Sequence, residues 1–355
     1  ENGDVTEDVL AWYERFARGK PGVIVVEATG IRDIPSGPLL RISSDKYLSG
    51  LTRLVDTIKT ASDGETRVLI QIIDFLQIRR RPDPTKYLNR HLILRPEHYV
   101  ALSLPFEAEN EPAVRTALLS LSPEDLESVL NQKEWEDLQY GYRERITDTH
   151  LPHIAQLPEI LPRLFCDAAI RAQAAGFDGV ELHYAHAYTM ASFLSATNNR
   201  TDGYGNTLEG RLRLPLEVYG AVREACSKDF VVGCRILSDE IIDQGTRIEE
   251  ACSIARALAN AGMDFLSVSR GGKFDDAKQP RVGGAVYPYT GRSGYECMPS
   301  YISDAQGPFG RNVEPVSLIR EFLRQNGLNT PVVLAGGQYG FYQAESLLKE
   351  NKADI

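Results

Sequence analysis

The chain lacks the features that commit a protein to a metal site, a disulfide framework or a membrane. Its five cysteines are scattered, and no two stand at C-x-x-C spacing, so we expect packed, reduced thiols rather than metal ligands or disulfides. No apolar run approaches the length that spans a bilayer. The residues from Glu1 to Asp4 have neither the basic nor the apolar region of a signal peptide. These absences predict a cytoplasmic protein that does not insert into membranes.

An excess of positive charge is also missing. The 355 residues include 39 Lys and Arg against 49 Asp and Glu, a net charge of −10. Such a balance disfavours general binding of nucleic acid or of anionic membrane surfaces. We therefore expect small-molecule partners, and the composition leaves open whether identical chains assemble into a homo-oligomer. The length exceeds that of an ordinary domain but suits a single α/β barrel with insertions.

What the sequence does contain is a regular alternation of strand and helix patterns. Continuous apolar or β-branched runs predict strands covered on both faces, and segments with apolar residues at helical spacing separate them. The predicted strands cover 23–29, 67–73, 180–182, 230–235, 264–269 and 331–335, and a seventh begins at 353–355. Strict alternation implies parallel strands joined by right-handed crossovers. An α/β fold with a parallel sheet follows, either a barrel or a doubly wound open sheet. The open sheet is disfavoured because no G-x-G-x-x-G follows the first strand.

A long insertion, residues 76–158, interrupts this alternation after the strand that contains Gln71. Ser122 followed by Pro123 predicts the start of a helix within it. Residues 107–148 hold eleven acidic against four basic side chains. The first part is basic, with Arg79, Arg80, Arg81, Lys86, Arg90 and Arg95. These residues either bind phosphate groups such as those of a coenzyme A thioester, or they form a solvated loop or pair with the acidic stretch, and these interpretations stay open.

The densest group of polar side chains follows the strand predicted at 180–182. His183, His186 and Tyr188 lie within six residues at its C-terminal end, where parallel α/β sheets keep their chemistry. The odd separation of the two histidines prevents both from sharing one face of a regular strand. A helical turn there would let them converge, and two imidazole N–H donors on a carbonyl oxygen would stabilise enolate-like charge. A metal would need a third ligand, and none lies nearby, so no metal is expected. The plain alternative is packed or surface histidines and a packed tyrosine.

This segment resembles the Old Yellow Enzyme family of FMN-dependent ene-reductases, in a branch like that of the 2,4-dienoyl-CoA reductases. Members carry His-x-x-His followed by x-Tyr, then Phe-Leu-Ser and Asn-x-Arg-x-Asp-x-Tyr-Gly. The match is dense between Gly176 and Arg211 and weaker over the rest of the chain. The resemblance implies one domain over 1–355, with 76–158 inserted. It also implies a TIM (β/α)8 barrel that lacks its first strand and breaks off at Ile355 as the eighth begins.

The resemblance further implies a cofactor and a reaction. FMN, reduced by NADH or NADPH, would give hydride to the β carbon of an α,β-unsaturated carbonyl compound. His183 and His186 would polarise the carbonyl, and Tyr188 would protonate the α carbon, since a phenol of unperturbed pKa about 10 stays protonated at neutral pH. An iron–sulfur cluster and FAD are expected only if a C-terminal extension exists.

Five further positions match the flavin-binding residues of the family. Ala28 matches the backbone beside the isoalloxazine ring, and Gln71 matches the side chain at its pyrimidine edge. Arg235 matches the cation beside N1 and O2, where a structural ion pair is the alternative. Gly336 and Gly337 match a phosphate cradle of backbone N–H groups.

Two residues depart from the family pattern, and two other functions stay in view. Gly210 stands where an Asn is usual, and Tyr184 where a small residue is common. The same scaffold also suits a flavin enzyme with other chemistry, such as oxidative demethylation, or a non-catalytic barrel fragment that serves as a binding module.

Overall fold

The structure, a computed structural model, describes residues 2–34, 39–77, 83–140, 144–186, 188–241, 244–271, 310–338 and 340–355. The chain divides into two compact units. The first comprises residues 1–76, 145–277 and 298–355, and the second comprises 77–144 and 278–297. Arg79, Arg80, Arg81 and Cys297 lie outside the described residues. Within the described residues no helix has both the length and the apolar character needed to cross a membrane.

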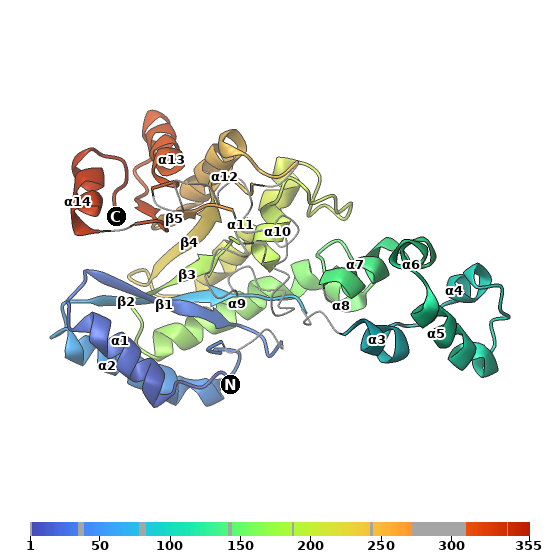
Figure 1. Ribbon diagram of the computed structural model, residues 1–355. Coiled ribbons are helices and arrows are strands. Elements are labelled where there is room, and N and C mark those ends of the chain that lie inside the picture. The colour runs from blue at the N-terminus through green and yellow to red at the C-terminus, as the bar shows by residue number, and fades with distance from the viewer. Residues whose placement is uncertain are drawn as a thin grey trace. The chain divides into compact units, whose positions relative to one another are not determined.

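The first unit is built on a parallel sheet whose strand order follows the chain (Figure 1). Its strands are β1 (Val23–Gly30), β2 (Arg67–Ile73), β3 (Gly179–His183), β4 (Val231–Leu237), β5 (Leu266–Ser269) and β6 (Val332–Leu334). Beside β6, Asp354 N donates to Val332 O at 2.9 Å and Leu334 N donates to Ile355 O at 2.9 Å. All six predicted strands are confirmed to within a few residues, because strands buried on both faces are continuous apolar runs in the sequence.

Helices follow the strands and bury their apolar faces against the sheet or against one another. They are α1 (Glu7–Ala17), η1 (Asp45–Tyr47), α2 (Leu48–Ala61), α8 (Pro152–Ala155), α9 (Leu157–Ala174), α10 (Thr189–Leu194), α11 (Leu208–Ala225), α12 (Ile248–Ala261), α13 (Val313–Gln325) and α14 (Phe341–Lys349). Neighbouring helices pack together, α9 against α11 and α12 against α13. The core of this unit lies between the sheet and these helices.

Two apolar side chains at helical spacing, Phe16 and Leu348, are exposed. The buried side chains of α1 are Leu10, Tyr13 and Ala17. Phe16 lies beside that stripe, 50% exposed, and contacts Trp12 edge to face with 5.1 Å between ring centroids. In α14 no side chain is fully buried, and Leu348 is 46% exposed. On these two helices the spacing of apolar residues alone therefore does not show which side chains are buried.

The second unit is a group of short helices with its own core. They are α3 (Pro84–Lys86), the π-helical turn η2 (Tyr87–His91), α4 (Pro96–Ala101), η3 (Ala108–Asn110), α5 (Glu111–Ser120), α6 (Pro123–Val129) and α7 (Gln132–Tyr140). The buried core residues are Tyr87, Leu88, Leu92, Tyr99, Val114, Leu118, Leu130 and Leu138. Ser122 caps α6 as predicted, because its side chain accepts from Asp125 N at 3.1 Å.

Candidate active site

His183, His186 and Tyr188 come together at the C-terminal end of β3. The strand is buried along its whole length and ends at His183. The backbone then bends at His186, whose φ of 57° lies in the left-handed region, and α10 begins only after Tyr188. The ring centroids of His183 and His186 are 5.4 Å apart, and those of His183 and Tyr188 are also 5.4 Å apart. The expected convergence occurs, but a left-handed turn produces it in place of the expected helical turn.

Both imidazoles are neutral at pH 7. Burial, together with His186 and Arg235, holds the pKa of His183 well below its ordinary value. Burial and Arg235 lower the pKa of His186 to about 3. His183 Nδ1 accepts from Ala185 N at 3.3 Å, so its proton resides on Nε2. His186 Nε2 lies 2.7 Å from Ser269 Oγ at the end of β5. A neutral imidazole has one N–H, and that of His186 lies on Nδ1 when Ser269 Oγ donates to Nε2.

Tyr188 is held between two rings. Its ring meets that of His183 at 85° and that of Phe75 at 87°, the latter with 5.0 Å between centroids. Phe75 follows Asp74, whose buried carboxylate binds Arg32 through Nε to Oδ1 at 2.5 Å and Nη2 to Oδ2 at 2.8 Å. Arg32 Nη2 also donates to Phe75 O at 2.9 Å. Arg32 therefore holds the backbone of the residue whose ring Tyr188 packs against.

Three of the residues proposed to bind flavin, Ala28, Gln71 and Arg235, lie on β1, β2 and β4. A bulge places Glu27 and Ala28 together opposite Gln71, because Val26 pairs with Ile70 but Thr29 pairs with Ile72. Gln71 Nε2 donates to Glu181 Oε1 on β3. Arg235 Nε lies 3.1 Å from the same oxygen and 3.2 Å from Ser267 Oγ. Glu181 thus links two of the proposed flavin ligands.

Sequence reasoning missed Glu181, Arg32 and Asp74. The run at 180–182 was interpreted as apolar although an acidic residue stands at its centre. A carboxylate inside a strand buried on both faces needs a partner, so this position was a usable signal. Asp74 comes directly after β2, and an acidic residue at the end of a buried strand was a second signal in the sequence. No comparable local pattern marked Arg32.

Gly336 and Gly337 follow β6 and both have positive φ, 89° and 73°. Asn312 ties this turn to the neighbouring strand, since its Nδ2 donates to Ala335 O at 2.9 Å and to Val268 O at 2.7 Å. The space that a Cβ of Gly336 would enter is open. Two successive left-handed residues at a strand end expose backbone N–H groups that suit an anion.

The two departures from the family pattern have structural explanations. Tyr184 is buried, and its hydroxyl donates to Pro215 O at 3.0 Å. A Cβ on Gly210 would lie 2.3 Å from Gly205 O. Glycine is therefore the residue that this backbone approach allows, and neither position contacts the histidine pair through a hydrogen bond among the described residues.

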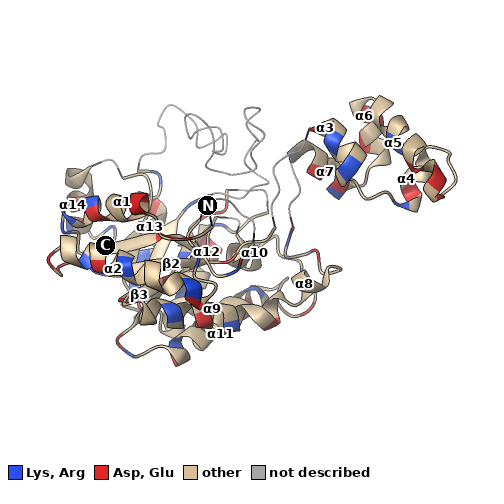
Figure 2. Ribbon diagram, turned by 90° about the horizontal axis from the view of Figure 1, so that it is seen from below, with Lys and Arg blue, Asp and Glu red and all other residues tan. Residues whose placement is uncertain are grey.

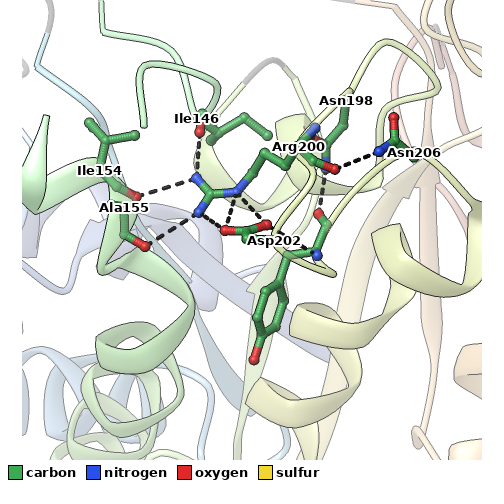
Figure 3. Close-up of polar contacts among 8 residues, drawn as sticks. Ile146, Ile154, Ala155, Asn198, Arg200, Asp202 and Asn206 are labelled. Carbon is green, nitrogen blue, oxygen red and sulfur yellow. Dashed lines mark hydrogen bonds and ion pairs between the residues drawn. The ribbon is translucent and has the colours of Figure 1, made fainter. Parts of the chain in front are cut away.

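Arg200, in the stretch after Phe-Leu-Ser, anchors backbone and is fully buried (Figure 3). Its Nη1 donates to Ile146 O and, at 3.3 Å, to Ile154 O, and its Nη2 donates to Ala155 O at 3.3 Å. Its Nε donates to Asp202 Oδ2 at 3.1 Å. Burial alone would raise the pKa of Asp202, but the hydrogen bonds and charge of Arg200, together with backbone N–H donors, outweigh burial and lower it.

The amides on either side complete this anchor. Asn198 Nδ2 donates to Phe193 O at 2.9 Å and to Tyr204 O at 2.8 Å. Asn206 Nδ2 donates to Arg200 O at 2.8 Å (Figure 3). The stretch therefore attaches the loop after α10 to the segment 146–155. Its role in the site is to hold that loop in place.

Replacing Arg200 with lysine should lower the free energy of unfolding by about 3 kcal/mol, because one ammonium cannot serve three carbonyls and a carboxylate in this geometry. Chemical denaturation followed by circular dichroism measures the change. Arg213→Lys is the control, since Arg213 is exposed over the Tyr204 ring, and its cost should stay within about 0.5 kcal/mol. Equal losses for the two variants would contradict the anchoring role.

The basic residues of the insertion divide into two groups. Arg95 Nε lies 3.6 Å from Glu134 Oε1, so for Arg95 the pairing with the acidic stretch is confirmed. Lys86 and Arg90 are exposed on consecutive helical turns, and neither forms an ion pair with a described residue. Elsewhere both signs of charge are interspersed along the helices of each unit (Figure 2).

Comparison with known proteins identifies relatives over the whole chain. The sequence model of the NADH:flavin oxidoreductase / NADH oxidase family matches residues 116–311, more than half of the chain. The NADH oxidase of Thermoanaerobacter brockii is 26% identical over 360 residues, which cover 100% of this chain and 44% of that protein. The metal reductase of Desulforamulus reducens is 27% identical over 356 residues, which cover 100% of this chain and 42% of that protein. The chain thus spans less than half the length of these two relatives.

Solved structures show the same fold. A 2-naphthoyl-CoA reductase in complex with 2-naphthoyl-CoA has a TM-score of 0.64 at 19% identity, covering 100% of this chain and 44% of that one. The old yellow enzyme homologue from Zymomonas mobilis has a TM-score of 0.58 at 19% identity, and the match covers 99% of this chain and 79% of that one. These likenesses confirm the predicted α/β fold of the TIM-barrel type.

Proposed function

Because the chain belongs to the NADH:flavin oxidoreductase / NADH oxidase family, that of the Old Yellow Enzymes, we propose that it reduces a carbon–carbon double bond conjugated to a carbonyl. FMN is the cofactor that family membership implies, and NADH or NADPH the electron source. The observation that carries the proposal is the convergence of His183, His186 and Tyr188 at the end of β3. Two donors and a phenol at one strand end suit a carbonyl oxygen and the carbon atom to be protonated.

The residues present fit FMN. All hydrogen bonds of the Arg235 side chain use Nε, so its two terminal nitrogens have no partner among the described residues and can face the N1 and O2 edge of a flavin. Gln71 keeps its carbonyl oxygen and one N–H for the pyrimidine edge, and Ala28 stands opposite it on the bulge. Gly336 and Gly337 supply backbone N–H groups for the phosphate. When bound, FMN supplies the hydride that adds to the β carbon.

The chain's own residues would do the remaining work. His183 and His186 donate N–H bonds to the carbonyl oxygen, where negative charge grows as hydride adds, and each such donor typically contributes about 10²–10³ in rate. The Tyr188 hydroxyl gives its proton to the α carbon. One hydride and one proton then account for the two hydrogens added across the double bond. Phe75 and His183 keep the Tyr188 ring in one orientation.

The substrate class within this proposal is an acyl-CoA thioester. In the second unit, taken by itself, Lys86 and Arg90 are exposed and form no ion pair with a described residue, and side chains of this kind bind phosphate groups. One structurally similar protein is a 2-naphthoyl-CoA reductase. A 2,4-dienoyl-CoA reductase-like specificity is the corresponding branch. Oxidative demethylation by the same scaffold and a non-catalytic binding module are the competing proposals.

Anaerobic spectroscopy tests the function directly. The protein with FMN should bleach on addition of NADH or NADPH and recover its absorbance when an enone or its CoA thioester is added. A binding module would not bleach, and product analysis separates double-bond reduction from demethylation. The thioester should be preferred over the free enone at low salt, and the preference should shrink as ionic strength rises because exposed charges are screened. A salt-independent ratio near one would reject the thioester but keep the reductase.

A further inference from the structure

Glu181 is a buried carboxylate at the centre of β3 that the proposed chemistry does not use. It is 1% exposed, and the strands on both sides are parallel neighbours, with Gln71 and Gly233 at its level. An ionised carboxylate in such a place is costly unless donors compensate it. Two donors reach its Oε1, Gln71 Nε2 and Arg235 Nε, the second at 3.1 Å. Both belong to residues proposed to hold the flavin.

The bond to Gln71 fixes how that amide faces the site. An ionised carboxylate only accepts hydrogen bonds, so the Gln71 NH₂ group must point toward Glu181 and its carbonyl oxygen away from it. One acceptor and one remaining donor are then presented to a ligand in a defined order. This is the pattern that the N3–H and an adjacent carbonyl of a pyrimidine edge require. A neutral amide at position 181 could either donate to Gln71 or accept from it, so it would not fix the orientation of the Gln71 amide.

The contact with Arg235 sets how much positive charge that guanidinium presents. No side chain stands opposite Glu181 on β4, because that position is Gly233, and a Cβ there would lie 2.3 Å from the Phe265 ring. Arg235, two residues further along β4, is the cation that compensates Glu181. Its terminal nitrogens stay available, but the nearby negative charge offsets part of its field.

We infer that Glu181 is a positioning residue for the flavin, one that orients the Gln71 amide and moderates the charge of Arg235. The inference rests on the proposed function, since it assumes that FMN lies against Gln71 and Arg235. Its consequence is that Glu181 controls two measurable quantities: the affinity for FMN through Gln71, and the reduction potential of the bound flavin through Arg235.

Two substitutions test the two effects, because one removes the charge of Glu181 and the other keeps it. Glu181→Gln keeps the shape and removes the charge, so the anionic reduced flavin should gain stability over the oxidised form by about tenfold, about 30 mV for a two-electron couple. Glu181→Asp keeps the charge but withdraws the carboxylate by one methylene. The dissociation constant for FMN should then rise about tenfold as the Gln71 bond is lost, with the potential near that of the wild type. Dye-equilibrated potentials and flavin fluorescence titration measure these quantities.

Glu250→Gln is the matched control, because Glu250 binds one buried arginine, Arg211, with 2.5 Å between Oε1 and Nη2, on α12 and outside the strands. It should leave both flavin quantities unchanged. The inference would be overturned if the flavin in Glu181→Gln had the same reduction potential as the flavin in Glu250→Gln. It would also be overturned if Glu181→Gln and Glu181→Asp raised the reduction potential equally. Thermal unfolding of the FMN-free variants shows that each is folded. A wild-type protein that takes up no FMN would overturn the proposed function and this inference with it, whereas normal uptake with insensitive variants overturns the inference alone.

Discussion

A variant in which alanine replaces both His183 and His186 should bind a phenolate ligand at least about 10³-fold more weakly than the wild type. Each lost donor to a developing oxyanion typically costs about 3–4 kcal/mol, and less than the full sum is expected for two donors that act together. The phenolate oxygen imitates the carbonyl oxygen as it gains negative charge. Titration of a para-substituted phenol into the FMN-loaded protein, followed by flavin absorbance, measures the loss.

The controls separate donor loss from disturbance of the fold. Each single alanine variant should lose part of the affinity, and His153→Ala, at an exposed position of the same unit, should lose none. A double variant that binds the phenolate as tightly as the wild type would reject the histidines as the oxygen-binding pair.

The same two histidines make the folded state sensitive to acid. Their pKa values are depressed in the fold, that of His186 to about 3, against about 6.5 in an unfolded chain. Between these values the unfolded chain binds more protons than the folded one, so the free energy of unfolding falls as pH falls from about 6.5 toward 3. Above 6.5 this contribution is fully present. The double alanine variant should lose less stability over that window, and parallel pH profiles would show that the buried imidazoles are not the cause.

The sheet was predictable from the sequence because its determinants are local. Each parallel strand is covered on both faces and is therefore a continuous apolar run, and the alternation with helices fixed the strand order. The motif at 183–188 located the polar cluster for a similar reason, since strand ends in such folds carry the functional side chains. The turn at His186 escaped prediction because a positive φ at a non-glycine residue is imposed by the surrounding structure.

The polar network behind the cluster depends on register, which the sequence does not display. Gln71 and Glu181 are 110 residues apart and meet because β2 and β3 pair in one particular alignment. Arg32 and Asp74 meet across two loops that follow different strands. For such pairs a sequence indicates only that a buried charge needs a partner, and the partner emerges from the packing.

The Tyr188→Phe variant should separate the two halves of the catalytic cycle. Reoxidation of the reduced flavin by an enone should slow by about 10²–10⁴-fold, the usual contribution of a positioned general acid. Reduction of the flavin by NADH or NADPH should stay near the wild-type rate, because that step needs no proton from the phenol. Phenylalanine keeps the ring that packs between His183 and Phe75, so the substitution removes the hydroxyl and little else. Anaerobic stopped-flow absorbance measures each half-reaction by itself.

Tyr184 offers the matched control for this experiment. Its hydroxyl is also hydrogen-bonded, to Pro215 O at 3.0 Å, but it is buried in the core. Tyr184→Phe should therefore cost about 1 kcal/mol of stability or somewhat more, because the partner carbonyl loses its donor, and should leave both half-reactions unchanged. If Tyr188→Phe slowed both half-reactions equally, the phenol would be shaping the site in general, and if it slowed neither, the proton would come from another donor. Selective slowing of reoxidation, absent from Tyr184→Phe, is the result that assigns the proton to Tyr188.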